Sequence, residues 1–293
     1  MQGVIARTDP NRICDYLLCP LLFYVKLYHL WIRYHIFVLI AYIEVTVMPM
    51  IGDMAPSFRA LTTIGEIDFP RDYYGKWVVL FSYGADFTPV STTEIMTFAS
   101  MINEFKEIDV ELIGISRDSL YSHIAWIRKI KELVWKDMKH VEITFPLIAD
   151  EKSEIVKEYD LVGSTDQDGC LSGSIFIVDQ VGKIRTILHY PTSVGINVKE
   201  IKRLVIALQK ADVEHVLIPA QWLPEDDVML PIPNNCSAAA ERMEKVNENI
   251  YSVDWFLSFR QTNLIADEED KIVPEVNPYP SAFSVRRRTN FRR

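Results

Sequence analysis

Short apolar runs alternate with stretches of helical periodicity from residue 48 to about residue 210. Apolar runs rich in β-branched residues predict buried strands, and apolar positions three and four apart predict helices between them. The expected strands span residues 76–82, 110–116 and 174–178, and the expected helices span residues 92–107, 119–131 and 199–210. A turn at 179–182 and an apolar run at 183–188 complete a hairpin with the last of these strands. The pattern predicts an α/β fold with a mixed central sheet flanked by helices.

The pattern changes after residue 215, where prolines interrupt the chain at short intervals. A short helix is expected at 237–246, and an aromatic stretch follows at 251–259. Because so thin a segment cannot bury a core of its own, we expect residues 213–262 to form an extended arm that wraps the main domain or a neighbouring subunit. The polar, proline-containing residues 263–293 predict a disordered tail.

Residues 16–43 are apolar and aromatic, but they include one lysine and one arginine. A spanning helix needs about 20 mostly apolar residues, and each cation inside it is costly. No small-residue cleavage site follows, as a signal peptide requires. Three interpretations remain: a membrane-associated or signal-anchor helix, a buried or partner-binding helix, or an extension upstream of a natural start at Met48. We favour the third, because a globular domain begins cleanly at Met48, and we set residues 1–47 apart from a main domain at 48–212.

The composition is that of a globular protein with a sizeable core, since 49% of the residues are hydrophobic and 24% are charged. The net charge of −9 gives no global support for a nucleic-acid partner, and the basic cluster at 286–293 is interpreted as part of the solvated tail. Four scattered cysteines without C-x-x-C or zinc spacing fit a reducing, cytoplasmic setting. No histidine pair has the spacing of metal ligands and no phosphate-binding glycine loop occurs, so neither a metal nor a cofactor is expected.

One segment carries a specific motif. Residues 81–94 read FSYGADFTPVSTTE, which resembles the active-site signature of the peroxiredoxins, a family of thiol peroxidases. The likeness is greatest to its one-Cys and archaeal branch, where the phrase is FSHPADFTPVCTTE. Other blocks resemble the family and occur in the family's order. One precedes the motif, at 51–58, and four follow it, at 111–126, 144–161, 175–191 and 219–233. The resemblance covers about residues 48–260 and implies a thioredoxin-like fold, a C-terminal dimerisation arm, and assembly as a homodimer or a larger ring, up to a decamer.

The family's reaction needs a thiolate that attacks the O–O bond of a peroxide. A helix N-terminus and an arginine lower the pKa of that thiol, and the resemblance implies that Thr88 orients the peroxide while Pro89 shields the reacting atom. This chain has Ser91 at the attacking position and Gly173 at the position of the arginine. A hydroxyl stays protonated without a strong base and cannot form a sulfenic acid. The resemblance therefore implies little or no ordinary peroxidase activity.

Further departures accompany that change. Tyr83 and Gly84 replace the usual histidine and proline of the signature. Ser252 and Ser258 stand where the archaeal branch has resolving cysteines in its arm. The loss of several functional residues together favours natural decay or repurposing over a single laboratory substitution.

Parts of the family's active-site frame remain. Glu94 and Arg185 match a family pair that braces the active-site helix. These residues and Thr88 can equally persist for folding alone, with Thr88 in a turn and Glu94 as an acid in the first helical turn, and we prefer that interpretation. Cys170 is an alternative thiol, although a lone cysteine is more often inert. No G-x-S-x-G elbow surrounds Ser91, which argues against a serine hydrolase.

The leading hypothesis is a catalytically degenerate peroxiredoxin that acts through its scaffold as an oligomeric binding or holdase-type protein. Co-assembly with an active paralogue is a variant of that role. The alternative is an active thiol peroxidase that uses Cys170 or another thiol. Membrane contact through residues 16–43 is the less favoured outcome for the N-terminal extension.

Overall fold

The computed structural model describes residues 28, 31–33, 48–161, 171, 173–244 and 249–262. The chain divides into two compact units, whose boundary falls between Lys202 and Arg203 inside helix α6 (Val198–Glu214). The boundary expected from the sequence lies later, after residue 212. Cys170 and the tail at 263–293 lie outside the described residues, as does most of the N-terminal extension. None of the described helices is long and apolar enough to span a bilayer.

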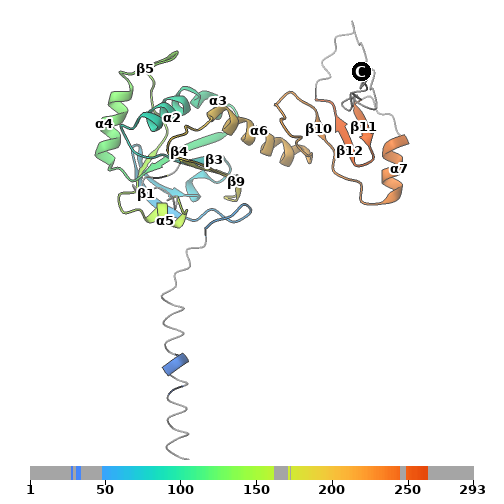
Figure 1. Cartoon of the computed structure of the whole chain (residues 1–293), viewed down its shortest axis with the longest axis horizontal. Helices are drawn as coiled ribbons and strands as arrows, with labels where there is room; N and C mark the ends of the chain where they lie inside the picture. Colours follow the sequence, from blue (N-terminus) through green and yellow to red (C-terminus); the bar gives the residue numbers. More distant parts are fainter. Residues whose placement is uncertain are drawn as a thin grey trace, which may run out of the picture. The chain divides into compact units, whose positions relative to one another are not determined.

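The first unit is built on a seven-stranded sheet with the order β2-β1-β7-β4-β3-β8-β9 (Figure 1). The strands are β1 Phe58–Thr62, β2 Gly65–Phe69, β3 Trp77–Ser82, β4 Val110–Ser116, β7 Leu147–Ala149, β8 Gly173–Val178 and β9 Ile184–Tyr190. The central strands β7, β4 and β3 run parallel, and the other neighbours pair antiparallel. The expected mixed central sheet is confirmed.

The helices of this unit are η1 Arg71–Tyr73, a single 3-10 turn, α2 Pro89–Ser100, α3 Ile102–Lys106, α4 Leu120–Ile130 and α5 Glu154–Glu158. A separate ribbon is formed by β5 Val134–Trp135 and β6 Met138–Lys139. Strand β3 shows that both faces of the sheet are covered, because all its residues are buried and successive side chains point to opposite faces. Leu80 packs in one cluster with Tyr159 and Phe176, whereas Phe81 stacks on Phe98 of α2 with ring centroids 4.1 Å apart.

Two helices differ in extent from the apolar periodicity. The helix expected at 92–107 begins earlier, at Pro89, and is interrupted at Met101, whose φ is −99° and ψ is 7°. Proline is favoured in the first helical turn because it lacks an N–H that would be unpaired there and its φ is already helical. The spacing of apolar residues did not indicate this first turn of α2. Helix α6 continues past residue 210 to Glu214.

The second unit contains the sheet β10-β12-β11 and one helix. Its elements are β10 Val228–Met229, α7 Cys236–Glu244, β11 Ile250–Asp254 and β12 Leu257–Arg260. Its small apolar cluster includes Ala207 of helix α6, which the sequence places in the main domain, so the expectation that residues 213–262 have no core of their own stays a prediction. Trp222 is 1% exposed in a cluster with Ala207, Val216 and Val228, and its Nε1 donates to the Asp226 carbonyl at 3.0 Å.

Candidate active site

The loop between β3 and α2 positions the candidate residues. Phe87 has a φ of 60°, a left-handed conformation that is costly for a residue other than glycine. Thr88 returns to an extended backbone as the N-cap of α2, and its Oγ1 donates to the Ala85 carbonyl at 2.7 Å. Pro89 then opens the helix. The Thr88 hydroxyl proton is therefore used to close the loop, while its oxygen can still accept a hydrogen bond.

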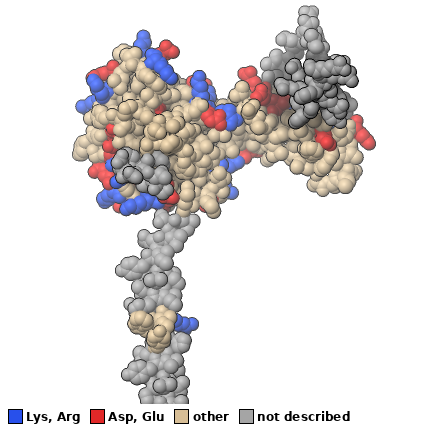
Figure 2. Space-filling view, viewed as in Figure 1, with Lys and Arg blue, Asp and Glu red and all other residues tan. Residues whose placement is uncertain are grey.

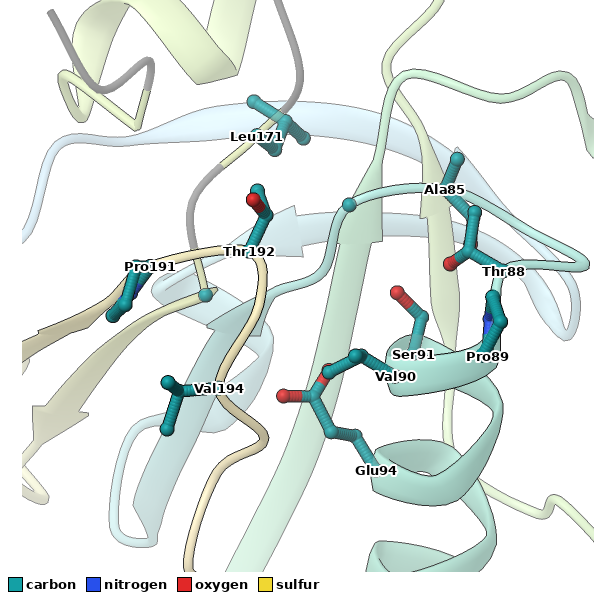
Figure 3. A pocket seen from close by; sticks show the side chains of 12 residues that line it. Ala85, Thr88, Pro89, Val90, Ser91, Glu94, Leu171, Pro191, Thr192 and Val194 are labelled. Atoms are coloured by element: carbon teal, nitrogen blue, oxygen red, sulfur yellow. The ribbon is translucent and has the colours of Figure 1, made fainter. Parts of the chain in front are cut away.

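A cavity of about 230 Å³ lies at the start of α2 (Figure 3). The described residues that line it are Gly84, Ala85, Thr88, Pro89, Val90, Ser91, Glu94, Leu171, Gly173, Pro191, Thr192 and Val194. The structure thus brings together six of the residues singled out from the sequence. Five lie on the β3–α2 loop and the first turns of α2, and Gly173 begins β8. The segment after β9, which carries Thr192 and Val194, forms the opposite wall and was not foreseen.

Ser91 lies in the first turn of α2 and is 3% exposed. The partial positive charge of a helix N-terminus would stabilise a thiolate at this place. Within the described part of the chain, however, no base or cation hydrogen-bonds the Ser91 hydroxyl. Gly173 contributes no side chain, and a Cβ there would lie 3.4 Å from Cβ of Tyr190. The site therefore has one feature that stabilises a thiolate, the N-terminus of α2, but position 173 supplies no guanidinium as the second.

Glu94 follows one turn later and is 5% exposed. Its Oε1 accepts a hydrogen bond from the Ile196 N–H at 2.9 Å. Burial raises the pKa of Glu94 above its ordinary value, and the Ile196 hydrogen bond opposes that rise in part.

Arg185 lies away from the cavity. Its Nη1 is 3.5 Å from Asp179 Oδ2, and its guanidinium carbon is 5.5 Å from the centroid of the Trp77 ring. Trp77 begins β3, whereas the cavity lies beyond the other end of that strand. The Glu94–Arg185 pair suggested by the sequence is therefore not formed, and Arg185 cannot brace α2 through Glu94.

A buried network supports the loop and was not predicted. His123 of α4 places Nδ1 2.9 Å from Asp86 Oδ2 and Nε2 3.2 Å from the Ile148 carbonyl oxygen. The Tyr83 hydroxyl lies 3.2 Å from Asp86 Oδ1, and burial raises the pKa of Tyr83 well above its ordinary value. Asp86 and His123 are 37 residues apart in the chain, so no local spacing could indicate their contact.

The remaining candidates lie elsewhere. Ser252 and Ser258 face each other across β11 and β12, with their Oγ atoms 2.8 Å apart. Cys236 is exposed in the second unit, and Cys170 lies outside the described residues. The described residues contain no cluster of three side chains that could hold a metal ion.

Fold and site together define a scaffold of the thiol-peroxidase type. Residues 51–187 match the AhpC/TSA family. A peroxiredoxin of Methanosarcina mazei is 52% identical over 215 residues, which are 73% of this chain and 98% of that protein. The chain belongs to the peroxiredoxin family.

Solved structures agree with this assignment. A yeast mitochondrial 1-Cys peroxiredoxin has 38% sequence identity and a TM-score of 0.62, and the match covers 73% of this chain and 99% of that one. A cysteine-to-serine mutant of the peroxiredoxin 6 of Arenicola marina has 30% identity with the same TM-score and coverage. The thioredoxin-like fold implied by the sequence resemblance is thereby confirmed.

Proposed function

We propose that this peroxiredoxin is catalytically degenerate and acts through its scaffold, as an oligomeric binding or holdase-type protein. The observation that carries the proposal is the surroundings of Ser91, which takes the place of the attacking cysteine in the family signature. A hydroxyl there needs a base to hold negative charge at neutral pH, and no described residue in contact with it supplies one. An oxygen atom also cannot be oxidised by a peroxide as a thiolate sulfur is.

The second candidate is an active thiol peroxidase that uses Cys170. One observation favours it: Leu171, the next residue in the chain, lines the cavity beside Ser91. A thiol that reaches this cavity would meet the positive end of α2, which favours its ionisation.

The expected partners follow from the scaffold. We expect a homodimer or a larger ring, up to a decamer, with co-assembly with an active paralogue as a variant. Basic and acidic side chains are interspersed on the visible face of the first unit (Figure 2), which supports the expectation of no nucleic-acid partner. The scattered cysteines support a cytoplasmic setting.

Peroxide consumption with thioredoxin or dithiothreitol as reductant tests the proposal. The native chain is expected to show no turnover above that of Ser91→Ala. Ser91→Cys restores the nucleophile, and Ser91→Cys with Gly173→Arg restores the cation as well, so turnover should rise in that order. Suppression of aggregation of a heat-denatured client enzyme, measured in parallel, should be the same for the native chain and Ser91→Ala.

Two outcomes would overturn the proposal. Enzyme-like turnover by the native chain contradicts degeneracy. If Cys170→Ala abolishes that turnover while Cys236→Ala, which removes an exposed thiol, leaves it intact, the second candidate is established. A native chain that neither assembles nor protects the client contradicts the scaffold role.

A further inference from the structure

Two polar side chains, those of Ser91 and Glu94, project into the cavity from one face of α2. Ser91 and Glu94 are three residues apart, which places them side by side on a helix. Figure 3 shows the Ser91 hydroxyl and the Glu94 carboxylate both directed into the space between α2 and the segment with Val194. Both residues are more than nine-tenths buried. The Ser91 hydroxyl has no hydrogen-bond partner among the described residues, and Glu94 has only the Ile196 N–H.

The charge of Glu94 is not balanced within the cavity. Glu94 is the only titratable residue among the described lining residues, and no described cation lies within ion-pair distance of it. The stretch 162–170, outside the described residues, contains no lysine, arginine or histidine. A buried carboxylate without a counter-ion is unfavourable, so a ligand that brings a positive charge gains more here than one that brings a neutral group.

A third acceptor lies near the same space. A Cβ placed on Gly84 would be 3.7 Å from Ser91 Oγ and 3.8 Å from the Leu171 carbonyl oxygen. The Ser91 hydroxyl oxygen and the Leu171 carbonyl oxygen therefore lie close to the same position, which stays empty because residue 84 is a glycine without a Cβ. An ammonium group has three hydrogen-bond donors and no acceptor, which matches a set made of a hydroxyl, a carboxylate and a carbonyl.

The other walls limit the rest of the ligand. Val90, Leu171, Pro191 and Val194 present apolar surface, and a cavity of about 230 Å³ is small for a ligand site. At about 30 Å³ for each water, it has the volume of roughly eight water molecules. A compact aliphatic group fits these walls, whereas a large or strongly polar body does not.

We propose that this cavity binds a small organic cation, a primary ammonium group on a compact aliphatic body. The ammonium donates to Glu94 and Ser91, and the body packs on the apolar walls. The positive end of α2 opposes a cation, but it amounts to about half a charge and its effect fades within the first turn, whereas a bound ammonium favours the ionised form of the Glu94 carboxyl, which brings a full charge. The inference rests on the proposed function in one respect: the cavity holds no attacking thiolate, so it is available for a ligand.

Isothermal titration calorimetry with three isosteric probes tests this assignment on the full chain, without any peroxide. Isobutylammonium is expected to bind at least about tenfold more tightly than the neutral isobutanol, because a charge-assisted hydrogen bond is replaced by a neutral one. Isobutyrate is expected not to bind. Glu94→Gln should weaken isobutylammonium binding by at least about tenfold, whereas Glu107→Gln, which removes an exposed glutamate, should leave it unchanged.

A pH series on the native chain keeps the test decisive if Glu94→Gln does not fold. Isobutylammonium binding should weaken as the pH falls through the range in which Glu94 takes up a proton, and isobutanol binding should not change. Equal affinity for isobutylammonium and isobutanol, preference for isobutyrate, or affinity independent of Glu94 would overturn the proposal. Peroxide turnover is measured separately. Its presence would contradict degeneracy, and absent ammonium binding without turnover would contradict this inference alone.

Discussion

His123 and Asp86 form a polar contact that is removed from solvent, with Nδ1 2.9 Å from Oδ2 and side chains 0% and 1% exposed. Asp86 belongs to the loop that leads into α2, and His123 belongs to α4, so the contact ties the loop to a neighbouring helix. Both ring nitrogens of His123 face acceptors, since Nε2 points to the Ile148 carbonyl. A buried polar group that loses its hydrogen-bond partner is costly, and this contact therefore holds the loop firmly.

Asp86→Asn should lower the free energy of unfolding by about 1–3 kcal/mol, as expected when a buried polar group loses its hydrogen-bond partner. The matched control is Glu132→Gln, which breaks an exposed pair with Lys129 and should cost no more than about 1 kcal/mol. Urea denaturation followed by tryptophan fluorescence measures both losses. If the two variants lose equally little, the buried contact does not stabilise the loop.

Glu94→Gln should stabilise the protein at neutral pH. Burial raises the pKa of Glu94 above its ordinary value of 4.5, so the folded state binds this proton more readily than the unfolded state does. Stability therefore falls as the pH rises from about that ordinary value through the folded-state pKa. Glutamine removes this loss, so the gain is present at pH 7 and disappears at pH values below 4.5.

Thermal unfolding of native chain and variant across this pH range measures the difference. The control Glu66→Gln removes an exposed carboxylate of β2 and should give little change at either end of the range. The prediction is wrong if the stability of Glu94→Gln, measured relative to the native chain, is lower at neutral pH than at acid pH. A favourable contact of the Glu94 carboxylate would then outweigh the cost of its desolvation.

Ser252→Cys with Ser258→Cys should form an intrachain disulfide. The two positions are directly paired across β11 and β12, and their Oγ atoms are already 2.8 Å apart, close enough for a disulfide with little backbone movement. Closing so short a loop stabilises by about 2 kcal/mol. After mild oxidation, thiol titration of the double variant should find as many reactive thiols as in the native chain. After reduction, it should find two more. The single variant Ser252→Cys should keep its one additional thiol under mild oxidation. Two additional thiols that persist in oxidant would show that the strands are not paired in this register.

Gly114→Ala should destabilise the first unit, because its Cβ would lie 2.7 Å from Leu147 Cδ2 and 3.2 Å from Phe81 Cζ. Overpacking of this kind costs about 1–3 kcal/mol. Gly84→Ala is the control, since its Cβ would meet no atom closer than Ser91 Oγ at 3.7 Å. Chemical denaturation should rank Gly114→Ala well below Gly84→Ala, and the reverse order would contradict the close packing of β4 on β7.

Local features of this protein could be predicted because they depend on residues close together in the chain. The strand expected at 110–116 is confirmed as β4, Val110–Ser116, since a run of buried β-branched and apolar residues indicates a strand wherever it packs. The hairpin of β8 and β9 is confirmed for the same reason, with its turn signal between two apolar runs. The motif around Thr88 and Ser91 indicated the family and the end of α2 at which the cavity lies.

The amino-acid sequence by itself indicated four of the seven strands of the main sheet, β3, β4, β8 and β9, the family that the chain resembles, and the serine in the signature. It did not indicate β1, β2 and β7. Only the tertiary structure decided which distant groups meet. Glu94 contacts Ile196, 102 residues away, and not Arg185. Periodicity shows which face of an element is buried but not what lies opposite, because that depends on how all the elements pack at once. The partners of a buried charge are therefore a property of the folded chain.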